Sequence, residues 1–424
     1  MTARPVLSPL HQPGQPPAPI RRDAGAWAAW FRRELMPWWA WRAADPDFGG
    51  FFDRLLPDGN VPAGEAKTCL AQARTLFTLS HLALGGDDRA LLAGAHAAYR
   101  FLRDDVLDPA TGGHVRAVAR DGRPTGVASD RVSRSYDQSF VVLALATYGR
   151  LAPSAAAATE IAAALEDCWS FIETRLVDRA SGLLLEDDGV ADPAAPDAPL
   201  RAQNPHMHMF EAALQAFEMT GEARWLARAD GLLAVALEHF LDADTGTIME
   251  FRAPDLSPAP GTAGPWREIG HQCEWAWLLH RYERLGGTAP VRAAAGRMMD
   301  FALAFGFCPE GPMRGAAYDG VAADGSLMAG TFLLWPQTEA AKAFVARFER
   351  GGEASDAAED ARRAREIAVL VFERYFAGRT VWCNQLDAQG RVLQPEALSR
   401  LLYHVAMFVT EGERLGLWPG PRHA

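Results

Sequence analysis

The chain has 424 residues, of which 49% are apolar and 22% charged, the composition of a globular protein with a sizeable core. Its formal charge of −11 argues against nucleic acid or an anionic membrane as the main partner. No run of about 18 apolar residues is present, so we expect no membrane span. The five scattered cysteines form no CxxC pair and are typical of free thiols in a reducing compartment, which predicts a cytoplasmic protein.

Residues 1–20 are rich in proline and lack the apolar core of a signal peptide, so we expect a disordered arm. No linker rich in Pro, Gly or Ser divides the chain after this arm. Residues 21–424 are therefore expected to form a single domain, as a monomer or a homodimer.

A repeated pattern begins after a first helix, which is expected over residues 24–42. A glycine turn, a short extended run and a second turn return about every 60–70 residues, six times in all, and such a period indicates a repeat architecture. The sixth copy lacks the leading glycine pair. Helical patterns fill the intervals in pairs, at 66–84 and 88–103, 135–151 and 155–175, 205–219 and 223–241, 271–286 and 289–305, and 336–350 and 356–376. A last helix, from near Pro395 to about 415, would pair with the first.

Twelve helices in short-linked pairs cannot each bury an apolar face alone, so they must stack on one another. The pattern predicts an all-α fold, an (α/α)6 barrel with six inner helices, six outer helices and short β-hairpins at one end. An open superhelical solenoid is the alternative. The closed barrel is favoured because the last helix needs the first as its partner.

The segment 201–221 predicts a helix with well-marked ends. Asn204 is a suitable N-cap, Pro205 fits the first helical position, and Gly221 fits the left-handed residue that follows a helix. Its apolar face leaves three polar residues unexplained, namely His206, His208 and Glu211.

Three histidines follow the repeat. His271 and Glu274 have the same i, i+3 spacing as His208 and Glu211, and His271 comes about one period after His208. His404 comes about two periods later still. In a ring of equivalent helices this spacing predicts three histidines at similar heights around one pore.

Other polar and aromatic groups begin the remaining inner helices. Arg74 lies on the first of these helices, Tyr136 begins the second and Trp335 begins the fifth. Imidazole, guanidinium and aromatic groups around one opening are the groups that a sugar site needs, because aromatic faces bind C–H surfaces and polar groups bind hydroxyls.

At these motifs the chain resembles the N-acylglucosamine 2-epimerase superfamily, which includes cellobiose 2-epimerases, mannose isomerases and sulfoquinovose isomerases. Four motifs carry the resemblance over about residues 24–415, and they begin at Asn204, Gly270, Trp335 and Leu402. The resemblance implies an (α/α)6 barrel. It also implies active-site positions at Arg74, Asn204, His208, His271, Glu274 and His404. His206 does not match the family pattern, and Arg400 occupies a position where family members differ, which leaves the substrate open.

These residues suit proton transfer next to a sugar carbonyl, which needs a base and a group that stabilises the enediolate oxygen. We expect His404 to carry the proton between C1 and C2, and His271, oriented by Glu274, to be the opposing acid or base. His208 would help to open the sugar ring, and Arg74 would hold the developing oxyanion. The expected substrate-binding residues are Asn204, Tyr136, Trp335, Glu211 and Arg400. We expect no cofactor and no metal.

The expected reaction is isomerisation of a free hexose, D-mannose to D-fructose, because no Gly-rich phosphate-binding loop is present. The motif around Pro205 and Met207 is most similar to that of mannose isomerases. A 2-epimerase of the mannose/glucose, cellobiose or N-acylglucosamine type is the main alternative. More remote alternatives are a metal-dependent isomerase with ligands from His206, His208 and Glu211, an inverting glycosidase, and a non-enzymatic binding protein.

Overall fold

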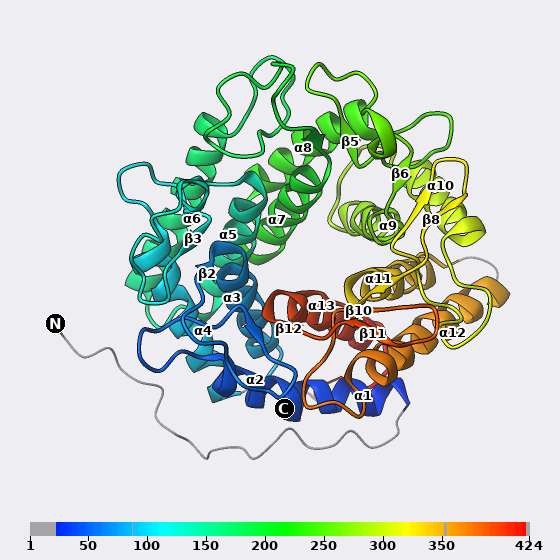
Figure 1. Cartoon of the computed structure of the whole chain (residues 1–424), viewed down its shortest axis with the longest axis horizontal. Helices are drawn as coiled ribbons and strands as arrows, with labels where there is room; N and C mark the ends of the chain where they lie inside the picture. The colour runs from blue at the N-terminus through cyan, green and yellow to red at the C-terminus, as the bar shows by residue number, and fades with distance from the viewer. Residues whose placement is uncertain (1–22, 87, 352–353, 421–424) are drawn as a thin grey trace.

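In the computed structural model, two concentric rings of helices surround one axis (Figure 1). The structure describes residues 23–86, 88–351 and 354–420, so the arm predicted over residues 1–20 lies outside the described part. The inner ring contains α3 (Cys69–Leu84), α5 (Ser135–Tyr148), α7 (Asn204–Thr220), α9 (Ile269–Arg284), α11 (Leu334–Arg350) and α13 (Leu402–Arg414).

The outer ring begins with one helical stretch made of α1 (Ala24–Trp30), the π-helical turn η1 (Phe31–Leu35) and α2 (Met36–Ala43). It continues with α4 (Arg89–Phe101), α6 (Ala155–Arg175), α8 (Ala223–Phe240), α10 (Arg292–Phe305) and α12 (Ala354–Val371). Two further π-helical turns, η2 (Leu102–Val106) and η6 (Phe372–Phe376), extend α4 and α12. The described residues also form four 3-10 turns, η3 (Ala128–Asp130), η4 (Gly149–Leu151), η5 (Gly261–Ala263) and η7 (Ser399–Leu401). The predicted (α/α)6 barrel is confirmed.

The two rings differ in how far their helices are covered. Almost every residue of α5 is buried, as expected of a helix that contacts neighbours on all sides. On the longer α6, by contrast, the buried residues form one apolar stripe that contains Ile161, Leu165 and Trp169, and the rest of its surface faces solvent. The sequence therefore encodes the two rings through the width of the apolar face.

The ring is closed rather than an open solenoid. The last inner helix, α13, packs against both α11 and α3. Next to it, β12 (Ala397–Leu398) pairs with β1 (Arg54–Leu55), and Arg32 of the first outer stretch forms an ion pair with Glu413 at 2.6 Å. The last helix was predicted to begin near Pro395. It begins instead at Leu402, after η7 (Ser399–Leu401), because β12 occupies the preceding residues.

Short strands connect the repeats at the end where the inner helices begin. The other strands are β2 (Lys67–Thr68), β3 (Ala117–Val118), β4 (Arg201–Ala202), β5 (Phe251–Arg252), β6 (Trp266–Arg267), β7 (Gly320–Ala322), β8 (Leu327–Ala329), β9 (Phe332–Leu333), β10 (Gln385–Leu386) and β11 (Val392–Gln394). Among the named strands, β7–β8 and β10–β11 form local hairpins. The other antiparallel pairs, β1–β12, β2–β3, β4–β5, β6–β7 and β9–β10, join neighbouring repeats. Isolated antiparallel bridges also form within the repeats, as between Leu107 and His114 and between Val177 and Leu184, so the predicted short hairpins are present.

A buried glutamine near the start of most inner helices anchors the preceding loop. Its side-chain amide donates to and accepts from the backbone of one loop residue, at 2.7–3.1 Å. The pairs are Gln72 with Phe51, Gln138 with His114, Gln272 with Ile248, and Gln337 with Ala317. In α7 His206 takes this place, because its Nε2 accepts from the backbone N–H of Leu184 at 2.8 Å. His206 therefore supports the fold.

The described helices contain no segment that is both long enough and apolar enough to cross a membrane. The five cysteines are all buried and unpaired, as expected. Gly221 adopts the left-handed conformation predicted for it, with φ of 73°. Gln203, rather than Asn204, occupies the position before α7, so Asn204 is the first helical residue.

Candidate functional site

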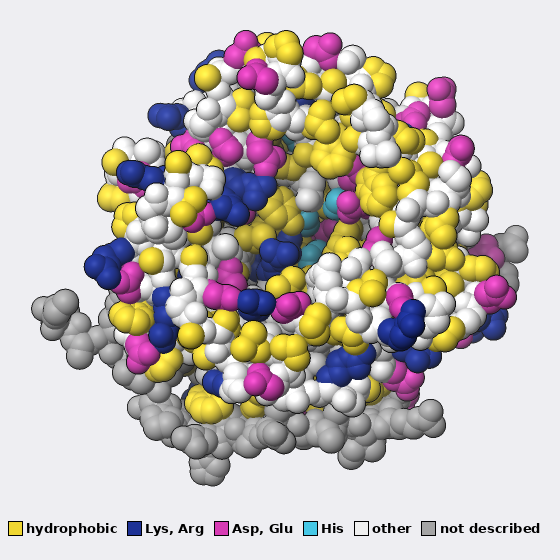
Figure 2. Space-filling model, viewed as in Figure 1, with side chains coloured by type: hydrophobic (Ala, Val, Ile, Leu, Met, Phe, Trp, Pro, Cys, Tyr) yellow, Lys and Arg dark blue, Asp and Glu magenta, His cyan; other side chains and the backbone are white. Residues whose placement is uncertain are grey.

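A cavity of about 490 Å³ lies at the N-terminal ends of the inner helices. Figure 2 shows it as a hollow in the centre of the molecule, with histidine, arginine and acidic side chains on its walls. Its volume falls within the range of about 300–1,000 Å³ that is typical of small-molecule sites. It is lined by His404, His271, His208, Arg74, Glu274, Asn204, Tyr136, Trp335 and Arg400, together with several residues not predicted from the sequence. The structure therefore brings together nine of the ten predicted site residues.

The repeat explains why these residues meet. In five inner helices the residue two positions after the loop anchor faces the axis: Arg74, Phe140, His208, Glu274 and Glu339. His404 has the corresponding place in α13. His271 lies three residues before Glu274, one turn nearer the cavity mouth, so the prediction that all three histidines share one height was wrong for His271.

His404 is held as a neutral imidazole between an acid and a cation. Its Nδ1–H donates to Glu339 Oε1 at 2.7 Å, and its Nε2 accepts from Arg74 Nη1 at 3.3 Å. Burial, and then the positive charges of Arg74 and Lys342, hold the pKa of His404 well below its usual value. His404 therefore presents an unprotonated nitrogen at the cavity floor.

Lys342 forms an ion pair with Glu339, the carboxylate that accepts from His404. Its Nζ lies 2.6 Å from Glu339 Oε2, and neither side chain has any exposed surface. The ammonium also lies 3.7 Å from the centre of the Trp277 ring. Burial raises the pKa of Glu339, and Lys342 opposes that rise. The three residues form a buried chain from Lys342 through Glu339 to His404.

His271 makes a similar hydrogen bond to a carboxylate, but its other neighbours are acidic rather than basic. Its Nδ1–H donates to Glu250 Oε2 at 2.7 Å, and a second carboxylate, that of Glu268, lies 3.4 Å away. Burial alone would lower the pKa of His271, but Glu250 and Glu268 outweigh burial and raise it to about 10. His271 is therefore an imidazolium at neutral pH.

The partner of His271 differs from the prediction. Glu274 was expected to orient this ring, but the hydrogen bond comes from Glu250, in the loop that precedes β5. Glu250 is itself fixed by Gln203 Nε2 at 2.9 Å and by the backbone N–H of Glu268 at 3.0 Å. The i, i+3 spacing placed Glu274 on the same side of α9 as His271, but its side chain faces the axis.

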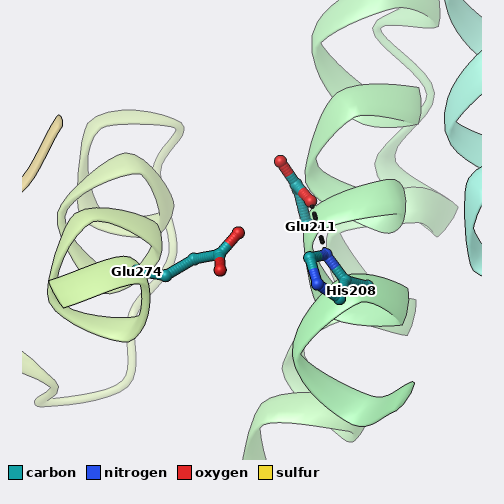
Figure 3. Close-up of side chains that lie close together, drawn as sticks. All are labelled: His208, Glu211 and Glu274. Atoms are coloured by element: carbon teal, nitrogen blue, oxygen red, sulfur yellow. Dashed lines mark hydrogen bonds and ion pairs between the residues drawn. The ribbon is translucent and has the colours of Figure 1, made fainter. Parts of the chain in front are cut away.

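Glu274 points across the barrel toward His208 and Glu211 of α7 (Figure 3). Burial, followed by the charge of Glu339, raises the pKa of Glu274 well above its usual value. Its two oxygens have no hydrogen-bond partner among the residues that the structure describes. Glu274 is thus a neutral acid that lines the cavity with an O–H to donate.

His208 pairs with Glu211 as its spacing predicted, at 3.0 Å between Nδ1 and Oε2 (Figure 3). Burial lowers the pKa of His208 to about 4, so the ring is neutral. Glu211 also accepts from the hydroxyl of Tyr403 and does not line the cavity. The prediction that Glu211 binds substrate was wrong, because one helical turn places it beneath His208.

Arg74 is buried and stacks on aromatic rings. Its guanidinium lies 4.0 Å from the ring centre of Phe140, and its Nη2 donates to the hydroxyl of Tyr136 at 2.7 Å. Its Nη1 donates to the backbone carbonyl of Arg400 at 3.4 Å. These contacts fix the orientation of the Arg74 guanidinium beside His404.

Nearer the mouth, the ring of Trp335 lies 4.8 Å from His271 and 5.9 Å from His404, centre to centre. An aromatic face between two imidazoles suits the C–H surface of a sugar. Asn204 Oδ1 has no partner among the described residues, so this side chain serves the cavity rather than a helix cap.

Sequence reasoning missed several residues here. Glu250, Glu268, Arg134 and Asn384 line the cavity from loops, and Glu339 contacts His404. Glu339 stood in the Trp335 motif two residues after Gln337, so the repeat could have identified it. The loop residues carry no helical spacing that would have revealed them.

Comparisons with known proteins identify the family of the chain. The sequence pattern of N-acylglucosamine 2-epimerase (GlcNAc 2-epimerase) matches residues 50–407. The chain belongs to this family. The N-acylglucosamine 2-epimerase family consists of sugar isomerases and epimerases, so the protein is an enzyme of this class.

Two relatives and one solved structure illustrate the family. A mannose-6-phosphate isomerase of Rhizobium meliloti strain 1021 is 30% identical over 399 residues, covering 93% of this chain and 97% of the relative. A D-mannose isomerase of Marinomonas mediterranea is 25% identical and covers 70% of this chain and 73% of its own. The structure of cellobiose 2-epimerase from Bacillus thermoamylovorans B4167 superposes with a TM-score of 0.77 at 20% identity, covering 92% and 99% of the two chains. The superposition supports the barrel fold alone.

Among the residues that the structure describes, three groups of donor atoms lie close enough together to be considered as metal ligands. They are His208 with Glu211 and Glu274, Glu250 with Glu268 and His271, and Glu274 with Glu339 and His404. In each group a histidine Nδ1 already donates to a carboxylate of the same group, and Glu274 carries a proton. A divalent ion would have to displace those protons, so the donor sets fit a metal poorly.

Proposed function

We propose that the protein is an aldose–ketose isomerase that interconverts D-mannose and D-fructose by proton transfer between histidine and the sugar. One observation carries the proposal: a neutral His404 and a charged His271 line the same cavity, with Trp335 between them. Pairs of titrating groups whose pKa values are driven apart mark an acid and a base. The printed names of the two relatives above, a mannose-6-phosphate isomerase and a D-mannose isomerase, support the mannose configuration.

The reaction begins with the opening of the sugar ring. The C2 proton becomes acidic only when C1 is a free carbonyl, so the ring O–C1 bond must break first. His208 Nε2 accepts the proton of the C1 hydroxyl, and Glu274 donates a proton to the departing ring oxygen. Both groups hold the required state, since His208 is neutral and Glu274 is protonated.

His404 then takes the C2 proton on Nε2. The electron pair of the C2–H bond forms the C1–C2 double bond, and the carbonyl electrons move to O1. Arg74 lies beside His404 and stabilises the negative oxygen, as a fixed donor does in an oxyanion hole. Glu339 stabilises the imidazolium that forms. Return of the proton from His404 Nε2 to C1, with transfer of the O2 proton to O1, gives the ketose.

A 2-epimerase is the second candidate, and the imidazolium of His271 favours it. If His271 delivers a proton to C2 from the opposite face, the product is the epimeric aldose. The same two histidines therefore allow either outcome, and the position of C2 between them decides the product. An inverting glycosidase is disfavoured, because Glu250 and Glu339 are each committed to a histidine.

Product analysis tests the proposal. The protein is incubated with D-mannose in D₂O, and fructose and glucose are separated and examined for deuterium at C1 and C2. Fructose labelled at C1 supports isomerisation, whereas glucose labelled at C2 supports the epimerase. We expect the activity to survive exhaustive treatment with EDTA. Loss on chelation with recovery on a divalent ion would contradict a metal-independent mechanism.

A further inference from the structure

His208 and Glu274 form an acid–base pair on opposite walls of the cavity. Glu274 extends from α9 across the axis toward His208 on α7 (Figure 3), and a carboxyl oxygen of Glu274 lies within 4.8 Å of a ring nitrogen of His208. Both side chains are buried and line the cavity. Since His208 is neutral and Glu274 carries a proton, a base and an acid face each other across the space that a sugar would fill.

The contacts behind His208 determine which of its nitrogens faces the sugar. Nδ1–H donates to Glu211 at 3.0 Å, so Nε2 is left as an acceptor. Burial would raise the pKa of Glu211, but His208 and Lys342 outweigh burial and lower it to about 2. The ring of Phe140 packs against the imidazole, 4.7 Å away from centre to centre, and limits its rotation. The ionised Glu211 can therefore stabilise a proton that His208 takes from a sugar hydroxyl.

Glu274 supplies the proton that must be given in exchange. Neither of its oxygens has a hydrogen-bond partner among the described residues, so its O–H can be donated to a ligand. The carboxyl groups nearby are already engaged, because Glu211 accepts from His208 and Glu339 accepts from His404. Glu274 is thus an uncommitted acid, and its proton is available in the cavity.

The spacing of the pair suits the two oxygens on the anomeric carbon of a pyranose. The hydroxyl oxygen O1 and the ring oxygen O5 are both bonded to C1, so they lie close together. One hydrogen bond of about 2.7–2.9 Å to each oxygen bridges a base and an acid at the observed separation. His208 Nε2 then takes the O1 proton, Glu274 donates its proton to O5, and the C1–O5 bond breaks. Neither group has to act on C2.

We propose that the protein is also a mutarotase, which exchanges the α and β anomers of an aldopyranose without reaction at C2. After ring opening, rotation about the C1–C2 bond presents the other face of the aldehyde to O5. O5 attacks that face and re-forms the C1–O5 bond, its proton returns to Glu274, and His208 returns its proton to O1. Each group regains its starting state, so no proton is gained or lost.

This second activity has a wider substrate class than the first. The inference takes its ring-opening step from the proposed function, but it requires neither His404 nor cleavage of the C2–H bond. An aldohexose that cannot become a ketose should therefore still change its anomer. For D-mannose itself, every opened ring that closes before the C2 proton is removed returns to solution as one of the two anomers.

Anomer exchange by the wild-type protein is the first test. The probes are freshly dissolved α anomers of D-mannose and of 2-deoxy-D-glucose, which lacks the oxygen that becomes the ketose carbonyl, and polarimetry follows them. We expect both exchanges to be accelerated relative to heat-denatured protein, and that of D-mannose to be at least as fast as fructose formation.

The outcomes separate this inference from the proposed function. Fructose formation without faster anomer exchange would overturn the inference and leave the proposed function standing. Faster exchange without fructose or glucose from D-mannose would support the inference and contradict the proposed function. Acceleration for D-mannose alone would tie the exchange to O2 and overturn the wider substrate class.

Matched variants then assign the activity to the pair. His208→Asn and Glu274→Gln keep polar side chains that cannot transfer the proton, so each should slow anomer exchange by roughly 10²–10⁴-fold. His404→Asn, which removes the base at C2, should stop isomerisation but change anomer exchange by less than about threefold. Undiminished exchange in the first two variants, or an equal loss in all three, would overturn the assignment. Binding of D-mannose, followed by tryptophan fluorescence, checks that each variant has kept its cavity.

Discussion

His404 on α13 and His271 on α9 each direct Nδ1 at a glutamate oxygen 2.7 Å away, yet they differ in charge. Glu339, the partner of His404, is paired with Lys342, and Arg74 adds a second positive charge. Glu250, the partner of His271, has another acid, Glu268, beside it. The comparison teaches that a hydrogen bond sets the direction of an imidazole, whereas the net charge around the pair sets its protonation state.

Removing the neutral histidine should have the largest effect. His404→Asn keeps a polar side chain but cannot carry the proton, so we expect kcat to fall by roughly 10²–10⁴-fold. Sugar binding should stay close to normal, and the variant should place no solvent deuterium on the sugar in D₂O. Turnover within about threefold of the wild type would show that His404 has a structural role and that the base lies elsewhere.

Changing the charge behind His404 should have the next largest effect. In Lys342→Met the ammonium that lowers the pKa of Glu339 is gone. Burial then raises this pKa further, and Glu339 stays protonated at neutral pH. We expect kcat to fall by roughly 10–10²-fold with a smaller change in KM. Since a carboxylic acid ionises as pH rises, the variant should recover activity at higher pH, where the wild type shows no such rise.

Lys67→Met is the matched control for that change. Lys67 is the other lysine of the chain, equally buried, and its Nζ lies 2.8 Å from Asp45 and outside the cavity. Loss of either buried ion pair should lower stability, but only Lys342→Met should alter the pH profile. The same altered profile in both variants would mean that Lys342 acts only through the fold.

Replacing Glu250, the carboxylate that accepts from His271, should have a moderate effect confined to alkaline pH. The pKa of His271 is about 10, so His271 should stay protonated in the wild type until the pH approaches that value. In Glu250→Gln this pKa falls toward the ordinary value of about 6.5, and activity near pH 8.5 should drop by roughly tenfold. At about pH 6 the ring is protonated in both proteins, and the difference should be small. A pH profile identical to that of the wild type would contradict an acid role for His271.

Glu268→Gln should have the smallest effect. Burial raises the pKa of Glu268 to about 7, so this carboxyl becomes charged only as the pH rises through neutrality. Its removal should shift the alkaline limb of the profile downward by less than about one pH unit. A shift larger than that of Glu250→Gln would mean that Glu268, rather than Glu250, holds the proton on His271.

Much of this arrangement could be predicted from the sequence, because it repeats. The period of the glycine turns predicted the closed barrel, and spacing along the inner helices brought Arg74, His208 and His404 to one pore. The contacts that set the charge states were harder to predict. Glu250 lies 21 residues before His271 in a loop, where no helical period applies. Glu211 kept its predicted spacing from His208, but one turn of helix placed it below the cavity.

Both lysines of the chain are internal counter-ions, and neither offers its amine to solvent. Every other basic side chain apart from histidine is an arginine, which does not react with acylating reagents. In the native protein such reagents should therefore leave both lysine side chains unmodified. Each acyl group that mass spectrometry detects on a lysine would report that a molecule had opened far enough to release Lys67 or Lys342.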